Sequence, residues 1–347
     1  MAWSQTSRKK SQTFVHRIAD KMHARLSAQK QAVHVPSLQG LEPSTPSTIF
    51  LQLCSWTIPY PYERLYYGGV LAALGWQWAS GAYYLTVAGS SGDASALYMA
   101  HLDTVAVLPS QLKLQERRGI ITTDGNGVLG GDDRCGVSLL LYLAHVVRLP
   151  GTYLLTTGEE CGRQGFRGFL ASPSADLIAD CSCCFSFDRR GTTEIITHQL
   201  GEQTCSDLFA DVLHDELRSA GLILQPSPDG LYTDSLELIG KMQIVNLSVG
   251  YHDAHSKREY VELGYLDRLG EAFAGLPIAL IGEIAADENK ELGELVADDD
   301  ELDDWRNEDN DYVDRWPDNR SYTTRNRWQD ELTAEYLDAP WRLATNE

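Results

Sequence analysis

The sequence predicts an α/β fold of the three-layer αβα type, in which helices cover both faces of a mostly parallel central sheet. One large domain forms this fold. Short apolar segments typical of strands alternate along the chain with longer segments of helical periodicity. The 347 residues are enough to bury a large core. Hydrophobic residues make up 43% and charged residues 22%, as is usual for a globular protein.

The expected strands are short, apolar and rich in β-branched or aromatic residues. They cover residues 83–87, 96–100, 152–156, 183–187 and 244–249. The expected helices cover residues 63–74, 136–147, 166–170, 206–219 and 265–273, and residues 49–53 fit either a helix or a strand. In such a sheet, ligands bind beyond the carboxyl ends of the strands, so polar residues at those ends are candidates for function.

Two flanking segments differ in composition from the central domain, residues 46–284. Residues 1–45 form a basic extension, in which apolar residues at 14–26 have helical spacing. A surface helix packed on the body is favoured there over a membrane-surface or partner-binding helix. Residues 285–347 form an acidic, tryptophan-containing tail. We expect that tail to pack partly on its own domain, with binding of a protein partner as the alternative.

Charge and hydropathy exclude two classes of partner. The formal net charge of −20 disfavours nucleic acid, and no apolar run is long enough to span a bilayer. No apolar segment follows the basic start, and the seven cysteines do not resemble a disulfide framework. These features predict a cytoplasmic location. An organelle transit peptide is the alternative, and Asp20 within the basic segment disfavours it.

The first chemical motif is AHLDTV at residues 100–105, directly after an expected strand. His101 lies at the carboxyl end of that strand, and alternation places Asp103 on the same side. A carboxylate beside an imidazole fixes its tautomer and orients it toward a metal ion. Such a pair is weak evidence alone, because most His-x-Asp pairs are ordinary surface residues.

Two further motifs place adjacent acids beside glycines. GGDDRCG at residues 130–136 precedes an expected helix, where one acid is explained as a favourable first-turn charge but two are not. GEECG at residues 158–162 follows an expected strand. There one glutamate can bind a metal ion while its neighbour accepts a proton from a bound water.

Two more strands end on polar groups, Asp188 in one and both His252 and His255 after another. Each motif alone fits a structural explanation. Together they supply nitrogen and oxygen ligands for two neighbouring divalent ions. The expected ligands are His101, Asp132, Glu160, Asp188 and His255, with one bridging carboxylate. This set leaves coordination positions open for water and substrate.

The order of these motifs resembles the co-catalytic zinc peptidases, which include peptidase T-like tripeptidases, glutamate carboxypeptidases and zinc aminopeptidases. The resemblance covers roughly residues 48–284 and implies a single catalytic domain. It implies that Asp132, which stands four residues before Gly136, bridges the ions in preference to Asp133. It also implies that Asp188 shares an ion with His101.

In the same resemblance Asp103 orients His101, Glu159 is the general base, and Glu160 is a ligand beside His255. Ser256 and Glu259 favour His255 over His252 as that ligand. Many relatives insert a lid domain between the last aspartate and the last histidine, and this chain has too few residues there for one. LYTDS at residues 231–235 resembles a loop near the family's substrate pocket. Tyr232 and Asp234 are therefore expected to contact substrate.

The resemblance implies a metal-dependent hydrolase that cleaves a peptide or amide bond with water activated by two divalent ions. Zinc is the expected metal, with manganese or cobalt as alternatives. The expected substrate is a peptide or an N-acyl small molecule. Two alternatives stay open: an N-acyl amino-acid deacylase with the same site, and a non-catalytic metal-binding interaction protein. Cys135 and Cys161 lie in the motifs but are not expected to be ligands.

Overall fold

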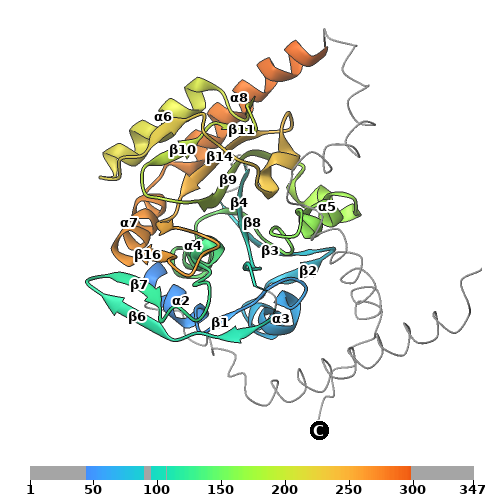
Figure 1. Ribbon diagram of the computed structural model, residues 1–347. Coiled ribbons are helices and arrows are strands. Elements are labelled where there is room, and N and C mark those ends of the chain that lie inside the picture. Colours follow the sequence, from blue (N-terminus) through green and yellow to red (C-terminus); the bar gives the residue numbers. More distant parts are fainter. Residues whose placement is uncertain (1–43, 90–94, 107, 298–347) are drawn as a thin grey trace, which may run out of the picture. The chain divides into compact units, whose positions relative to one another are not determined.

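The computed structural model describes residues 44–89, 95–106 and 108–297, all within one compact unit. An eight-stranded sheet lies at its centre, with the strand order β13-β10-β14-β9-β4-β8-β3-β2 (Figure 1). The four middle strands run parallel: β14 (Gln243–Ser248), β9 (Cys181–Arg189), β4 (Ser95–His101) and β8 (Gly151–Thr156). The predicted mostly parallel α/β fold is confirmed.

Antiparallel pairings join the outer strands to this parallel centre. β3 (Ala82–Val87) pairs antiparallel with β8 and with β2 (Gln77–Ala79). On the other side β10 (Glu194–Ile196) pairs antiparallel with β14 and parallel with β13 (Gln225–Ser227). β2, β10 and β13 were not predicted, because strands of three residues carry too little periodicity to be recognised.

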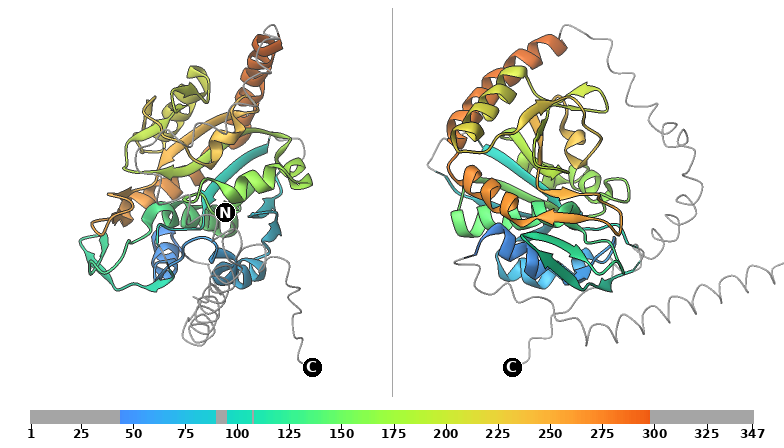
Figure 2. Two further views of the ribbon diagram at one scale, coloured as in Figure 1. Left: turned by 45° about the vertical axis from the view of Figure 1, so that its right-hand side comes forward. Right: turned by 60° about the vertical axis from the view of Figure 1, so that its left-hand side comes forward.

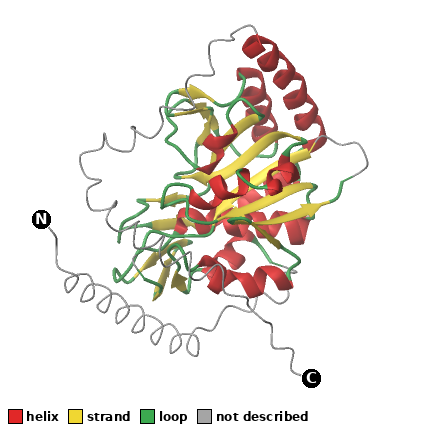
Figure 3. Ribbon diagram, turned by 90° about the vertical axis from the view of Figure 1, so that its right-hand side faces the viewer, coloured by secondary structure: helices red, strands yellow, loops and turns green. Residues whose placement is uncertain are grey.

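The pleat of the strands divides their side chains between two covered faces, and Figure 3 shows helices around the central strands. On one face, Leu97, Met99, Leu154 and Ile244 join a buried cluster with Phe166 and Phe169. These two phenylalanines belong to α5 (Gln164–Leu170), which lies near the 3-10 helix η2 (Pro173–Ile178).

On the other face an aromatic stack links the strands to two helices. Tyr98 stacks on Tyr153 and Phe185, with ring centroids 4.6 and 5.7 Å apart. Phe185 reaches Phe209 of α6 (Asp207–Ser219) and Phe273 of α7 (Leu263–Ala274). The predicted helices at 206–219 and 265–273 therefore pack on the sheet as their apolar periodicity indicates.

Helix α4 (Gly131–Tyr142) packs on β4 and β9 and continues into the π-helix η1 (Leu143–Val147). α2 (Pro46–Leu53) packs on α4 and is a helix, which decides between the two interpretations of residues 49–53. Thr45 caps it reciprocally with Thr48, and Pro46 occupies its first turn. α3 (Glu63–Ala73) matches the predicted helix at 63–74.

A second, antiparallel sheet lies beside the start of α4. Its order is β15 (Tyr251–His252), β16 (Tyr260–Glu262), β7 (Ile120–Thr123) and β6 (Leu114–Arg117). A Cβ on Gly131 would meet Val261 at 2.6 Å and Tyr251 at 2.9 Å, so this sheet touches α4 at its first residue. Short ladders join β1 (Trp56–Thr57) to β5 (Ser110–Gln111) and β11 (His198–Gln199) to β12 (Glu202–Gln203).

Helix α8 (Ile278–Ala297) runs beside α6 (Figure 2) and does not end at residue 284, where the sequence places the domain boundary. Asn289 explains why it continues, because this side chain donates to the Ser182 carbonyl at 2.8 Å and accepts from Gln243 at 2.9 Å. The helix is therefore tied to β9 and β14 beyond the predicted boundary. The predictions for the basic extension and for the tail after residue 297 lie outside the described residues.

Within the described ranges, no single helix has the length and hydropathy of a membrane span. Helix α7 and the first part of α8 pass that test only as a pair bent by 78°.

Candidate metal centre

The polar residues singled out from the sequence meet at the carboxyl ends of the central strands. His101 is the last residue of β4, Asp188 lies near the end of β9, and Glu159 and Glu160 follow β8. These three strands are parallel neighbours, so their carboxyl ends lie side by side. Asp132 comes from the first turn of α4, and its backbone φ and ψ are not helical.

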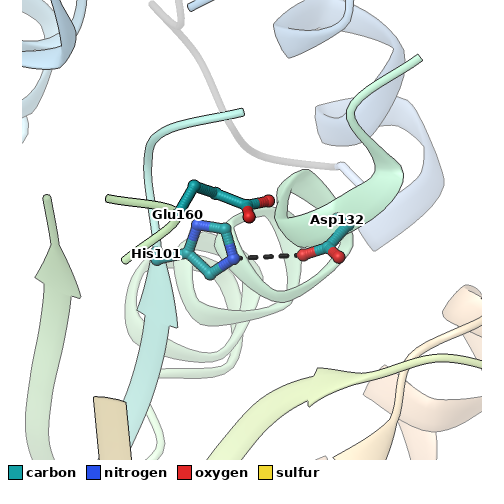
Figure 4. Close-up of side chains that lie close together, drawn as sticks. All are labelled: His101, Asp132 and Glu160. Atoms are coloured by element: carbon teal, nitrogen blue, oxygen red, sulfur yellow. Dashed lines mark hydrogen bonds and ion pairs between the residues drawn. The ribbon is translucent and has the colours of Figure 1, made fainter. Parts of the chain in front are cut away.

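The Asp132 carboxylate lies between two imidazoles. Its Oδ1 is 3.1 Å from His101 Nε2, and its Oδ2 is 3.1 Å from His255 Nε2. Figure 4 shows the Asp132 side chain facing His101, with Glu160 beside them. The two oxygens of one carboxylate thus face two different histidines, which is the arrangement expected of a group shared by two ions.

Each histidine has one further acid beside it. Glu160 Oε1 is 2.8 Å from His255 Nε2, and Asp188 Oδ1 is 3.7 Å from His101 Nε2. Donor atoms of His101, Asp132 and Glu160 all lie within 4.8 Å of one another. The structure therefore brings together all five ligands expected from the sequence, grouped around Asp132 as the resemblance implies.

The structure distinguishes Asp132 from Asp133 and His255 from His252, the two pairs between which the sequence motifs had to choose. Asp133 also lies near His101 and Asp188, but its oxygens accept the backbone N–H groups of His101 at 3.1 Å and Gly136 at 3.0 Å. Its carboxylate thereby joins β4 to α4 instead of facing both histidines. The Asp132–Asp133 peptide bond is cis.

His252 lies in β15 and its ring stacks on Tyr260, with centroids 4.5 Å apart. Its Nε2 is 2.8 Å from Glu262 Oε1, so the hairpin of the second sheet satisfies this imidazole. His255 instead lies in the turn between β15 and β16, with φ of 62°, and reaches Asp132 and Glu160. The geometry therefore favours His255 as the donor.

Asp103 joins the histidine to the glutamate pair. Its side chain is fully buried, and Oδ1 lies 3.3 Å from His101 Nδ1. The same oxygen accepts the Glu159 N–H at 3.0 Å, and Oδ2 accepts the Glu160 N–H at 3.1 Å. One carboxylate thus orients the imidazole and holds the backbone of both glutamates.

Other buried polar groups hold the remaining donor segments. Glu259 accepts the N–H groups of Gly130 at 2.7 Å and Asp132 at 3.1 Å, which explains why a glutamate follows His255 in the motif. Asn246 accepts the Asp188 N–H at 2.9 Å and donates to its carbonyl at 3.0 Å. The donors therefore stand on a backbone that is fixed by hydrogen bonds.

Sequence reasoning missed the supporting residues Asn246, Tyr251 and Glu63. The Tyr251 hydroxyl donates to Asp188 Oδ1 at 3.2 Å, and Glu63 accepts the Gly158 N–H at 3.0 Å. Asn246 could have been recognised from the sequence, because it is a polar residue inside an apolar strand. Glu63 could not, because an acidic residue at the start of a helix is common.

Burial and the charges of neighbouring groups shift the pKa values of the acids. Burial is the main cause that raises the pKa of Glu160 to about 7, and burial together with the Asp132 charge raises the pKa of Asp188 to about 6. Burial also raises the pKa of Glu159, and the charges of Asp188 and Asp234 add to this. For Asp132, hydrogen bonds from His101 and His255 outweigh burial and hold its pKa well below the usual range.

The pKa values of both imidazoles are raised, because the nearby carboxylates favour the charged form. Hydrogen bonds to Asp132 and Glu160 raise the pKa of His255 to about 11. Burial disfavours a charged His101, but the Asp188 charge and the nearby carboxylates outweigh it and raise its pKa. Buried carboxylates at this density require compensating positive charge. The imidazole and carboxylate donors suit divalent metal ions, so the residues fit the expected cofactor.

The structure places the two expected substrate contacts differently. Asp234 is buried at the start of η3 (Asp234–Leu238), and its carboxylate accepts a hydrogen bond from Thr156, which pairs with His101 across β8 and β4. Asp234 therefore lies beside the donor cluster. Tyr232 is half exposed, and the guanidinium carbon of Arg163 lies 5.2 Å from its ring centroid.

The two motif cysteines and the whole stretch between Asp188 and His255 lie within the described residues. Cys135 is buried and Cys161 is partly exposed, and neither belongs to the donor clusters found among the described residues. Between Asp188 and His255, where every residue is described, α6 covers the central sheet and β10, β13 and β14 are part of it. That stretch holds no separate domain.

No family model matches the chain, and no curated protein matches its sequence. Solved structures do match its fold. The aminopeptidase PepT from Bacillus cereus aligns over 70% of this chain and 98% of its own, with a TM-score of 0.58 and 16% identity. This chain has the fold of that aminopeptidase.

Two further structures support that assignment of the fold. A tripeptidase from Staphylococcus aureus covers 70% of this chain and 98% of its own, with a TM-score of 0.56 and 15% identity. An aminopeptidase from the archaeon Desulfurococcus kamchatkensis covers 71% and 97%, with a TM-score of 0.55 and 14% identity. The fold that the motif order implied is therefore confirmed.

Proposed function

We propose that this protein is a metal-dependent hydrolase that cleaves a peptide or amide bond with water activated by two divalent ions. The observation that carries the proposal is the Asp132 carboxylate, with Oδ1 3.1 Å from His101 and Oδ2 3.1 Å from His255. Zinc is the metal best suited to imidazole and carboxylate donors in a catalytic site, and manganese and cobalt are alternatives.

The donors divide into two sets that share Asp132. His101 and Asp188 belong to one set, and His255 and Glu160 belong to the other. Three protein donors in each set leave positions open for water and for the scissile carbonyl. Ions bound there supply Lewis acidity, which polarises the carbonyl and lowers the pKa of water toward about 7.

Glu159 is the proposed general base. Asp103 accepts its backbone N–H at 3.0 Å, and Glu160 next to it lies within reach of His255. Burial and the neighbouring carboxylates raise the pKa of Glu159, and a raised pKa suits a carboxylate that alternates between base and acid near neutral pH. Glu159 takes a proton from the attacking water and returns it to the leaving amine.

Substrate is proposed to lie against Asp234 and Tyr232. The position of Asp234 supports a role in binding, because Asp234 touches Thr156 beside the end of β4. Their chemistry does not separate a peptidase from an N-acyl amino-acid deacylase. Both reactions use the same attack of water on an amide carbonyl.

Elemental analysis of the purified chain, followed by assays on a peptide library and on an N-acyl amino-acid panel, tests the proposal. We expect two divalent ions per chain and turnover of free peptides. Turnover of N-acyl amino acids alone would instead support the deacylase. Two bound ions without hydrolysis of any amide would contradict an enzyme and support the non-catalytic metal-binding protein.

A further inference from the structure

The turn that carries Glu159 and Glu160 is held by four consecutive backbone N–H groups, and each has an acceptor outside the turn. The Thr157 N–H donates to the Gly81 carbonyl at 3.1 Å, and the Gly158 N–H donates to Glu63 Oε1 at 3.0 Å. The next two N–H groups donate to the two oxygens of Asp103 at 3.0 and 3.1 Å. Of the two side chains in this set, Asp103 belongs to a metal-site motif and Glu63 does not.

Glu63 lies far from the motifs in sequence but directly behind the turn. It is the first residue of α3, and its side chain is only 1% exposed. It is not in a donor cluster. Burial is the main cause that raises its pKa, and the Asp103 charge adds to this. A glutamine has nearly the same shape and keeps an acceptor oxygen at the same position.

Gly158 leaves the turn little freedom to adjust. Its φ is +67°, in the left-handed region that favours glycine. A Cβ at this position would meet the Tyr60 ring at 2.8 Å, so the backbone packs closely against that ring. The Tyr60 ring and the Glu63 carboxyl group therefore both hold the peptide directly before Glu159 in place.

We infer that Glu63 is a positioning residue for Glu159, acting through the Gly158 N–H. The inference rests on the proposed function, in which Glu159 is the general base. Loss of the acceptor would leave a buried N–H without a partner, and the peptide would move to reach water. Such movement displaces the Glu159 carboxylate from the attacking water. Glu160 is still held by Asp103 and His255, so bound metal is retained.

Gln243 provides a matched control for a purely structural role. It is fully buried, and its Oε1 accepts the Ser206 N–H at 2.6 Å. It is the first residue of β14, at the end of the parallel strands opposite the donor cluster. Gln243→Ala therefore also removes the side-chain acceptor of a backbone N–H, here that of the partly buried Ser206, together with the hydrogen bond to Asn289. It leaves the turn at residues 157–160 unchanged.

The test compares Glu63→Ala, Glu63→Asp, Glu63→Gln and Gln243→Ala in the full-length, zinc-loaded protein. We expect Glu63→Ala to lower kcat about 10- to 100-fold, as losses of supporting hydrogen bonds do, with KM and zinc content unchanged. Glu63→Asp withdraws the oxygen by one methylene and should resemble Glu63→Ala. Glu63→Gln should restore kcat, and Gln243→Ala should lower the melting temperature but leave kcat unchanged.

Hydrogen–deuterium exchange of the segment 154–165 provides a readout besides activity. Faster exchange there in Glu63→Ala and Glu63→Asp, and wild-type exchange in Glu63→Gln and Gln243→Ala, would support positioning. If the wild type is active and both Glu63→Ala and Glu63→Asp keep its full kcat, the inference is overturned. So would a loss of kcat in Gln243→Ala as large as in Glu63→Ala. A wild type without turnover contradicts the proposed function, and the exchange data then decide the inference separately.

Discussion

Binding of metal to the metal-free protein should release protons, because the donors hold them when no ion is present. Hydrogen bonds to Asp132 and Glu160 raise the pKa of His255 to about 11. The pKa of His101 is also raised, since the Asp188 charge and nearby carboxylates outweigh burial. His255 is therefore protonated near neutral pH, and the raised pKa favours the protonated form of His101 as well. A protonated imidazole must lose its proton before it can bind a metal ion.

The number of protons follows from the four groups. His255, with a pKa of about 11, releases about one proton at pH 7. Glu160, with a pKa of about 7, adds about half a proton, and Asp188, with a pKa of about 6, adds about a tenth. Binding of both ions should therefore release more than about one and a half protons, with up to about one more from His101. Because protons are products, affinity rises with pH, and this rise is steepest below pH 7, where the carboxylates also carry protons.

Calorimetric titration of the metal-free protein with zinc at pH 7, in two buffers of different ionisation heat, measures this number directly. His252→Ala is the matched control, since that imidazole bonds to Glu262 and should leave the proton count unchanged. High-affinity zinc binding without proton release, or an affinity that stays constant between pH 6 and 8, would refute the reasoning.

Three other changes should have separable effects. Glu159→Gln should keep its zinc by elemental analysis and lose about 10²- to 10⁴-fold in kcat, and unchanged kcat would contradict its role as base. Asp103→Ala should weaken zinc binding about 10- to 100-fold by titration, because it removes the group that orients His101. Phe185→Ala should destabilise the protein by about 3–5 kcal/mol in urea unfolding, because this ring is fully buried, with zinc content of the folded protein unchanged.

The middle of the sheet could be predicted from sequence because its strands are buried on both faces. The segments at 96–100, 152–156 and 183–187 are nearly continuous apolar runs, which is typical of central parallel strands. The second sheet could not be predicted. β15 and β16 have only two and three residues, and β16 pairs with β7 from a distant part of the chain. Nothing local in either segment records that pairing.

The site was predictable in composition but not in detail. Acids and histidines at strand ends identified its donors, whereas spacing alone could not distinguish adjacent Asp132 and Asp133. That distinction lies in backbone hydrogen bonds, because Asp133 accepts the N–H groups of His101 and Gly136. The role of Glu63 depends on a hydrogen bond to Gly158, 95 positions along the chain, and no local pattern indicates such a contact.

The central claim is that Asp132 is shared by two metal ions, and anomalous X-ray scattering from crystals of the zinc-loaded protein tests it most directly. We expect two peaks about 3.5–4 Å apart, one beside His101 and Asp188 and the other beside His255 and Glu160, with one Asp132 oxygen toward each. A single peak, or two peaks that do not share Asp132, would contradict the account.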